Sequence, residues 1–444
     1  MVNKTKRKDS RRLEKLLKER VLTKDQHKEA WAHFRDGGIN AAMTYVGAQA
    51  APERTELGSP VPYQVWGSEQ IDQGTLDQMS NAARLPVSVV GALMPDAHLG
   101  YGLPIGGVLA TRNAVIPYAV GVDIACRMKV TIFDANERDL NKHQEMLKAV
   151  LLNQTRFGAG STFEKGNKSD HDVLDHPDWN ATQLLKQLYD KGVDQLGTSG
   201  GGNHFVEWGL FTVHGDELVG VAPGTYIALL SHSGSRGVGY KIADYYSKLA
   251  MKTRPHLPKE VKHLAWFDMD SAEGQEYWTA MHLAGEYASA NHAVIHDRIA
   301  KGVGFQPLAS VENHHNFAWK EDFNGEEVIV HRKGATPAGE NVFGIIPGSM
   351  GDPGYVVRGK GLPESINSAS HGAGRKMSRS KAKSSITRNA QKAYLKERGI
   401  ELLGGGLDEA PQAYKSIHEV MQAQSDLVKI VGEFHPRIVR MADD

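Results

Sequence analysis

Residues 117–128, PYAVGVDIACRM, contain Cys126, the only cysteine in this chain of 444 residues. Asp123 stands three positions before it. A thiolate is a soft metal ligand and a carboxylate is a hard one, so this Asp-x-x-Cys pair can offer two different ligands to one ion. A lone cysteine is more commonly a small, inert, buried residue. The stretch alone leaves both interpretations open, and the segments on either side of it favour a metal site.

Glycine-rich segments that carry histidine recur on both sides of this stretch. Since glycine has no Cβ, backbone in such segments can approach a phosphate or a metal closely. We predict that each is a loop beside a short strand. They are residues 94–107 (MPDAHLGYGLPIGG), 196–208 (LGTSGGGNHFVEW), 232–239 (HSGSRGVG) and 368–380 (SASHGAGRKMSRS). Residues 313–320 (NHHNFAWK) contain no glycine and add a pair of histidines.

The residues of these loops that could bind a metal are more informative together than singly. Each histidine alone is typical of a hydrogen-bonded structural residue, but a mixture of thiolate, imidazole and carboxylate suits Zn, Mn or Fe. Candidate ligands are Asp123, Cys126, His204, His232, His314 or His315, and His371. Arg236, Lys333 and Arg375 lie in or beside these loops and suit oxyanions such as phosphate. A metal beside phosphate-binding loops indicates phosphoryl or nucleotidyl transfer.

Composition limits the class of protein. The chain has 52 basic and 52 acidic residues, so no global field attracts nucleic acid. One cysteine excludes an intrachain disulfide and fits a reducing compartment. The first residues lack the apolar core of a signal peptide. The sequence contains no run of about 18 apolar residues, so we predict no membrane span. We therefore expect a cytoplasmic protein with no membrane association.

Residues 1–60 differ from the globular sequence of residues 61–444, and we predict two units with these bounds. Residues 1–20 hold nine basic and three acidic residues, a net charge of nine minus three, or +6. Leu13, Leu16 and Leu17 are spaced for a short amphipathic helix. Thr23 could cap a second helix that ends near Gly37 and Gly38. A solvated arm and an RNA-binding arm both fit this pattern.

The order of predicted elements favours an α+β fold with a mixed sheet. Strand–loop–strand units outnumber β-α-β units, which argues against a doubly wound sheet. We predict a long helix over residues 271–299 and a last helix over residues 414–431, followed by a short tail.

From about Val61 onward the chain resembles the RtcB family of RNA ligases. The resemblance rests on MPDAHLGYGLPIGG, VGVDIAC, LGTSGGGNHF, LLSHSGSRG and SASHGAGRKMSRS, in the order the family has them. It implies an RtcB-like α+β core whose active site is built from glycine-rich loops. It also implies an enzyme of RNA splicing or repair that uses GTP and two Mn²⁺ ions. Such enzymes join a 2′,3′-cyclic phosphate or 3′-phosphate end of RNA to a 5′-hydroxyl end through a histidine–GMP intermediate.

The resemblance also assigns roles. His371 corresponds to the nucleophile that takes GMP, and Asp96 to the residue that orients it. Asp123, Cys126 and His204 correspond to the ligands of one manganese, and Cys126, His232 and His315 to those of the second. His315 is preferred to His314 because it directly precedes Asn316 and Phe317. Arg236 corresponds to an RNA phosphate contact. The nucleotide contacts correspond to Asn203, Phe205, Glu207, Ser349, Gly372, Gly374 and Tyr414.

The sequence departs from the family at three places. Arg127 follows the cysteine where the family usually has glycine, and Gly354 stands where a small or hydroxyl residue is common. Met441 and Ala442 stand where the family usually ends in Lys-Gly, with the lysine reaching guanine, so guanine selectivity is open to question. Two alternatives remain: a metal-dependent phosphoesterase that opens RNA cyclic phosphates, and a non-catalytic protein that binds RNA ends.

Overall fold

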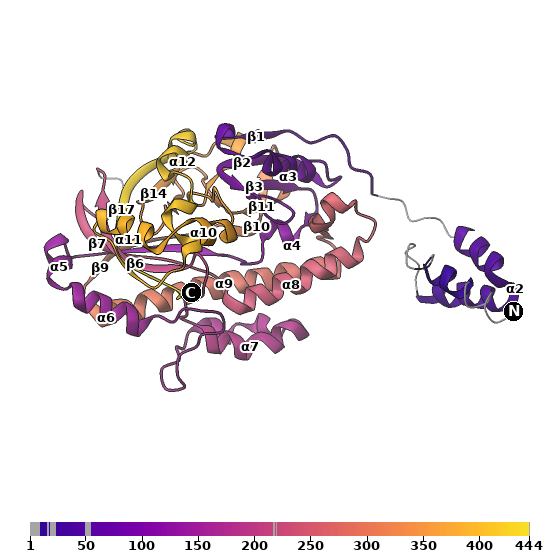
Figure 1. Cartoon of the computed structure of the whole chain (residues 1–444), viewed down its shortest axis with the longest axis horizontal. Helices are drawn as coiled ribbons and strands as arrows, with labels where there is room; N and C mark the ends of the chain where they lie inside the picture. Colours follow the sequence, from indigo (N-terminus) through magenta and orange to yellow (C-terminus); the bar gives the residue numbers. More distant parts are fainter. Residues whose placement is uncertain are drawn as a thin grey trace.

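The computed structural model describes residues 9–15, 17, 24–48, 55–215, 218 and 220–443. Two sheets form the body of the chain, and long helices cover one side of the larger sheet (Figure 1). The predicted α+β architecture with a mixed sheet is confirmed, because most strand pairs are antiparallel and two are parallel.

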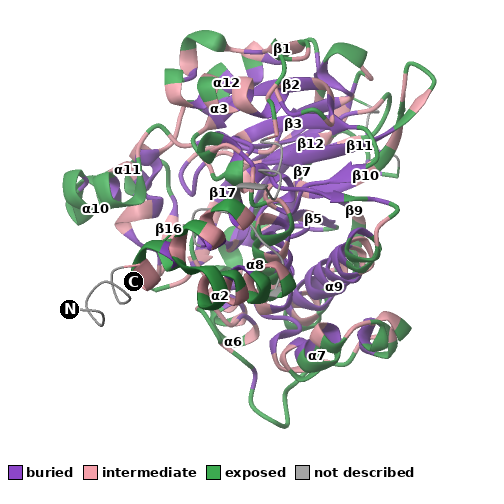
Figure 2. Cartoon of the chain, turned by 90° about the vertical axis from the view of Figure 1, so that its right-hand side faces the viewer, coloured by how far each residue is buried: buried purple, intermediate pink, exposed green. Residues whose placement is uncertain are grey.

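The larger sheet has the order β13-β14-β17-β6-β7-β5-β9, and β16 pairs with β17. Buried apolar residues lie on its strands, so the sheet is at the centre of the molecule (Figure 2). Its strands are β5 (Arg127–Phe133), β6 (Phe205–Val213), β7 (Gly224–Ser233), β9 (Pro307–His314), β13 (Phe343–Ile346), β14 (Gly354–Gly359), β16 (Glu401–Leu403) and β17 (Val428–Met441).

The smaller sheet has the order β1-β2-β3-β11-β10, and two short strand pairs accompany it. Its strands are β1 (Tyr63–Val65), β2 (Ser88–His98), β3 (Ile105–Thr111), β10 (Asn316–Phe323) and β11 (Glu326–Lys333). The pairs are β4 (Ala114–Val115) with β8 (Phe267–Asp268), and β12 (Ala335–Pro337) with β15 (Ser368–Ser370).

The predicted long helix over residues 271–299 is confirmed. The predicted helix of residues 271–299 is α9, which starts after an N-cap at Ser271 whose side chain accepts a hydrogen bond from Gly274 N–H. The helices of the body are α3 (Gln73–Ala83), α4 (Pro117–Val120), α5 (Glu137–Lys142), α6 (Gln144–Gln154), α7 (Gln183–Gln195), α8 (Arg236–Thr253), α9 (Ala272–Val303), α10 (Arg379–Ser385), α11 (Arg388–Glu397) and α12 (Ile417–Ala423). Among the described residues, no helix combines the length and apolar character needed to cross a bilayer.

The predicted helix over residues 414–431 is wrong. Only Ile417–Ala423 is helical there, and residues 428–441 form β17, the longest strand of the larger sheet. The predicted short tail is therefore a strand between β14 and β6. Alternating buried and partly exposed residues from Gly432 to Ile438 carry the period of two that a strand needs.

Residues 94–107 are only partly a loop, in contrast to the prediction. Strand β2 continues through His98 and β3 begins at Ile105, with an irregular register between Leu93 and His98. Asp96 is therefore part of a buried strand rather than a turn. The glycines and prolines of this stretch predict a loop, but an irregular strand pair can accommodate both residue types.

The N-terminal residues contain two helical segments with a small core of their own. Residues 9–15 are helical, and α2 (Lys24–Ala48) packs Ala30, Ala42 and Val46 against Leu13 and Leu17. The predicted end of the helix at Gly38 is a kink (φ 74°, ψ −169°), after which helix resumes. Residues 16 and 23, part of the predicted helix and its cap, lie outside the described residues. The predicted domain boundary at residue 60 stays a prediction.

Candidate active site

Four adjacent strands of the larger sheet bring the predicted metal ligands to one edge. Cys126 directly precedes β5, His204 directly precedes β6, and His232 is the next-to-last residue of β7. His315 directly follows β9. Because these strands run antiparallel in the order β6-β7-β5-β9, the starts of β5 and β6 and the ends of β7 and β9 share one edge. Residues 189 positions apart in the chain therefore meet.

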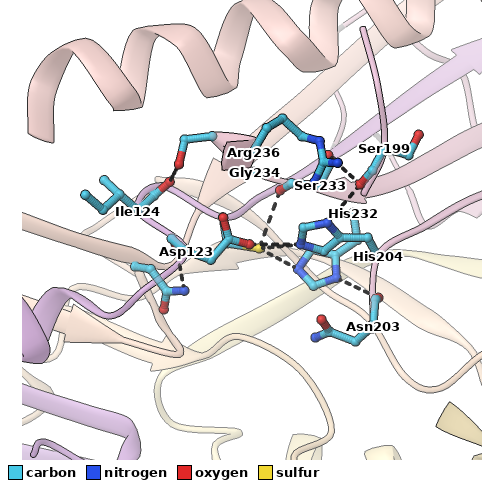
Figure 3. A network of polar contacts seen from close by, with 12 residues as sticks. Asp123, Ile124, Ser199, Asn203, His204, His232, Ser233, Gly234 and Arg236 are labelled. Carbon is cyan, nitrogen blue, oxygen red and sulfur yellow. Dashed lines mark hydrogen bonds and ion pairs between the residues drawn. The ribbon is translucent and has the colours of Figure 1, made fainter. Parts of the chain in front are cut away.

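The Cys126 sulfur contacts both His204 and His232, and Figure 3 shows these two rings beside Asp123. Cys126 Sγ lies 3.0 Å from His232 Nε2 and 3.5 Å from His204 Nε2. His204 Nε2 is also 2.9 Å from Asp123 Oδ2, and His232 Nε2 is 3.3 Å from His315 Nε2. One ligand atom from each of Cys126, His204 and His232 lies within 4.8 Å of the other two. All five predicted ligands are therefore brought together.

The hydrogen bonds of the outer ring nitrogens show that this donor set suits a cation. His204 Nδ1 is 2.8 Å from the carbonyl of Ser199, and His232 Nδ1 is 3.1 Å from that of Asn203. Since a carbonyl only accepts, both Nδ1 atoms carry the proton, and both Nε2 atoms direct lone pairs at the sulfur. His204 Nε2 then faces the Asp123 carboxylate, acceptor to acceptor. A metal ion among these atoms removes the repulsion, and the backbone carbonyls orient its imidazole ligands.

The pKa values of four side chains in this group are shifted by burial and by neighbouring charges. Burial, together with the charges of neighbouring histidines, lowers the pKa of His232 to about 3. The same two causes lower the pKa of His315 well below its usual value. Burial, with the nearby Asp123 carboxylate, raises the pKa of the Cys126 thiol. Burial acts to raise the pKa of Asp123 as well, but the nearby His204, Cys126 and Arg236 together outweigh it and the pKa is lowered. A bound cation would displace the thiol proton.

His371 and Asp96 form the second part of the site. His371 directly follows β15, and its Nδ1 lies 2.7 Å from Asp96 Oδ2. The same oxygen accepts hydrogen bonds from the backbone N–H groups of His371 (3.2 Å) and Gly372 (3.3 Å). Since the carboxylate accepts, Nδ1 donates and the His371 Nε2 lone pair is left free to attack. The ring centroids of His371 and His315 are 4.9 Å apart, so the pair borders the metal-ligand group.

His371 and four of the metal ligands, Asp123, Cys126, His232 and His315, line one cleft of about 660 Å³. Six of the seven predicted nucleotide contacts line it: Asn203, Phe205, Ser349, Gly372, Gly374 and Tyr414. The seventh, Glu207, does not. It is buried in β6, two residues beyond Phe205, and burial raises its pKa well above the usual value. A contact of Glu207 with a nucleotide stays a prediction.

The two arginines beside the metal ligands are already engaged. Arg127 donates to Glu312 Oε1 (2.9 Å) and to the carbonyl of Gly285, so its charge is directed at β9 and α9 rather than into the cleft. Arg236 donates to Thr198 Oγ1 (3.0 Å) and to the carbonyl of Gly158. Its guanidinium lies against Gly200, the first glycine of the run at residues 200–202. Burial lowers the pKa of Arg236, although the nearby Asp123 opposes this. A role of Arg236 in holding RNA phosphate stays a prediction.

Sequence reasoning missed an ionic network among the residues that line the cleft. Arg375 donates to Glu409 (3.2 Å) and to Tyr414 Oη (3.3 Å), and Arg379 also donates to Glu409. Glu409 in turn accepts a hydrogen bond from Tyr414. A sequence signal for Glu409 was present, because residues 408–417 (DEAPQAYKSI) contain both Glu409 and Tyr414. No charge pattern along the chain pairs it with Arg375 and Arg379.

The last strand places Met441 in the same cleft. Met441 pairs with Phe205 across β17 and β6 and lines the cleft. The position where the resemblance predicts a guanine-binding lysine is therefore part of the site and carries an apolar side chain.

Comparisons with known proteins show the family to which the chain belongs. A sequence model of the family described as tRNA-splicing ligase RtcB matches residues 78–442. The chain belongs to the RtcB family. It is 34% identical to the RNA-splicing ligase RtcB of Escherichia coli K12, over 83% of this chain and 95% of that protein. It is 31% identical to the tRNA-splicing ligase RtcB of Nanoarchaeum equitans, over 85% of this chain and 94% of that protein. The predicted membership of this family of ligases is confirmed.

Proposed function

We propose that this RtcB-family chain is a GTP- and manganese-dependent RNA ligase that works through a histidine–GMP intermediate. The observation that carries the proposal is the joint placement of two groups in one cleft. One is a histidine whose Nδ1 is held by a buried carboxylate, and the other is a buried thiolate–imidazole–carboxylate set. Neither group alone distinguishes a ligase from a metal-binding protein.

His371 has the geometry of a nucleophile. In the proposed step its Nε2 lone pair attacks the α-phosphorus of GTP, an N–P bond forms, and the bond to pyrophosphate breaks. The ring gains positive charge as this happens, and Asp96 stabilises that charge through Nδ1–H. The buried position of Asp96 strengthens the effect, because few waters screen the pair. Transfer of GMP to the RNA 3′-phosphate returns His371 to its neutral form.

Asp123, Cys126, His204, His232 and His315 would hold the metal, with Cys126 contacting both halves of the set. Their mixture of soft and hard ligands fits Mn²⁺, and also Zn²⁺ or Fe²⁺. A bound divalent ion stabilises the charge that develops on phosphate oxygens. The chain's own contribution is to keep the imidazoles unprotonated and to exclude water from the sulfur.

The RNA substrate in this proposal carries a 3′-phosphate or 2′,3′-cyclic phosphate on one strand and a 5′-hydroxyl on the other. The names of the relatives, which refer to RNA and tRNA splicing, support RNA as the substrate. A cytoplasmic location stays a prediction from composition.

The test is incubation of the full chain with two RNA strands that carry these ends, with GTP and Mn²⁺ present or omitted. We expect a joined product only when both are present. Opening of the cyclic phosphate without joining, and without need of GTP, would identify the phosphoesterase alternative. RNA binding with no change to either end would identify a binding protein.

A further inference from the structure

Beside the cleft lies a group of aromatic side chains that neither the metal site nor the nucleotide contacts use. Tyr101 is on the loop between β2 and β3 and is 69% exposed. Tyr118, on α4, and His263, on the 3₁₀ helix η4 (Lys259–Leu264), complete the group. Ring centroids are 6.4 Å apart for Tyr101–Tyr118, 5.8 Å for Tyr101–His263 and 5.0 Å for Tyr118–His263. We call these three residues the aromatic platform.

The platform borders the cleft on the side of the metal ligands. Leu99, two residues before Tyr101, and Val122, which follows α4, both line the cleft and are 57% and 47% exposed. Val122 is next to Asp123, a predicted metal ligand. Figure 1 shows α4 between the strands β10 and β11 and the helix α8, against both of which it packs. The platform therefore lies next to residues that line the cleft beside the metal ligands.

The loop that carries Tyr101 is held rigidly. Gln78 donates to the Gly100 carbonyl and accepts from Gly100 N–H, and Lys333 Nζ donates to the Tyr101 carbonyl. Gly102 has φ +74°, and a Cβ there would lie 3.0 Å from the carbonyl oxygen of His263. The loop therefore presents an exposed tyrosine in a fixed position, which lowers the entropy lost when a ligand stacks on it.

Lysines accompany the rings. Lys262 and Lys333 both lie near His263. Burial is the largest cause that lowers the pKa of His263, and the two lysine charges lower it as well. Lys262 is exposed, and Lys333 lines the cleft. Asp244 lies near Tyr118 but is paired with Lys248 at 2.7 Å. One exposed ring and two partly exposed rings with the exposed Lys262 beside them match a single-stranded nucleic acid, whose bases stack on rings while its phosphates meet a cation. Lys333 is buried, and burial lowers its pKa to about 7, so its part is to hold the loop.

We propose that the aromatic platform stacks a base of the RNA end next to the bond being formed, with Tyr101 as the main contact. The inference rests on the proposed function for the identity of the ligand. The Tyr101 hydroxyl makes no hydrogen bond within the described part of the chain, so the ring itself carries the interaction. The strand that supplies the base, with the 3′-phosphate or with the 5′-hydroxyl, is distinguished by the experiment.

The experiment measures the affinity of fluorescent single-stranded RNA for the full chain by anisotropy, with no need for ligation. Two RNAs are used, one with a 3′-phosphate and one with a 5′-hydroxyl, each with an intact or an abasic terminal nucleotide. Stacking on an aromatic side chain predicts that Tyr101→Ala weakens binding of one intact RNA on the order of 5- to 150-fold. Tyr101→Phe should bind like wild type.

The matched control is Tyr189→Ala, because Tyr189 is also an exposed tyrosine but lies on α7, against Trp179 and away from the cleft. It should bind RNA like wild type. The abasic RNA should bind wild type as weakly as intact RNA binds Tyr101→Ala, and the two changes together should cause no further loss. This non-additivity is the signature of direct contact.

Two results would overturn the inference. Unchanged RNA affinity in Tyr101→Ala would assign the platform to another partner, such as a protein. Losses that simply add would mean that Tyr101 and the terminal base do not touch. Failure of the proposed ligation leaves this binding test intact, so the two proposals fail separately.

Discussion

Replacing Asp96 by asparagine should slow guanylylation without abolishing it. Asp96 Oδ2 accepts three hydrogen bonds, the shortest from His371 Nδ1 at 2.7 Å. The amide oxygen of asparagine can accept the same three bonds, so the position of the ring is kept and only the negative charge is lost. A hydrogen bond to a charged group contributes about 1.5–3 kcal/mol and a neutral one about 0.5–1.5 kcal/mol. The difference of about 1–2 kcal/mol corresponds to a rate about 5- to 30-fold lower.

The same substitution should also lower stability. Asp96 Oδ1 is buried and has no hydrogen-bond partner among the described residues. Asparagine would place its NH₂ group there, and an unsatisfied buried donor costs about 1–3 kcal/mol. The free energy of unfolding, measured in urea, should fall by that amount. Metal content should not change, because Asp96 is not one of the proposed ligands.

The assay is a single-turnover reaction of α-labelled GTP with excess enzyme, quenched at intervals, with the rate of protein labelling as the result. Asp426→Asn is a matched control, since Asp426 accepts a hydrogen bond from Trp66 Nε1 (3.0 Å) and has no contact with His371. It should label like wild type. A wild-type rate in Asp96→Asn would refute the role of the charge. Complete loss of labelling in a folded, metal-loaded Asp96→Asn would mean that the amide donates to Nδ1 and reverses the tautomer.

Three further changes test other parts of the account. Cys126→Ala should lose bound manganese and all guanylylation and Cys126→Ser should keep at most weak activity, measured by metal analysis and GTP labelling; full manganese occupancy with normal labelling in the alanine variant would refute the shared ligand. Deleting residues 1–20, which carry a net charge of +6, should weaken RNA binding and flatten its salt dependence while guanylylation is unchanged; an equal salt slope with and without these residues would exclude an RNA-binding arm. Met441→Lys should raise the preference for GTP over ATP about tenfold or more, because an ammonium group would then reach the nucleotide cleft; an unchanged GTP/ATP ratio of labelling rates would place guanine recognition elsewhere.

The metal-ligand set could be predicted because its residues are chemically distinctive and stand at strand ends. Cys126, His204, His232 and His315 each lie within one residue of the end of a strand of the larger sheet. The antiparallel order of these strands brings the four residues to one edge. The choice of His315 needed the family resemblance, since His314 has the same chemistry and is the last residue of β9. The structure supports that choice, because His315 faces His232, whereas His314 packs against Phe317 and Trp319.

The parts that failed depend on contacts far apart in the sequence. Residues 428–441 become a strand because β14 and β6 lie on either side, and no local signal names those partners. Glu409 joins the cleft through Arg375 and Arg379, 34 and 30 positions before it. Tyr101 was visible only as one residue of a glycine-rich loop, and its exposure depends on how Gly102 meets His263.

The most direct test of the central claim is to map the residue that carries GMP. The full chain is incubated with α-labelled GTP and Mn²⁺, digested under basic conditions that preserve an N–P bond, and analysed by mass spectrometry. We predict one acid-labile GMP adduct, on His371, that is absent from His371→Ala while manganese binding is retained. His371→Ala should still join RNA supplied with a 3′-guanylylated end, because His371 has no further role once GMP is on the RNA. An adduct on any other residue, or one that survives in His371→Ala, would contradict the account.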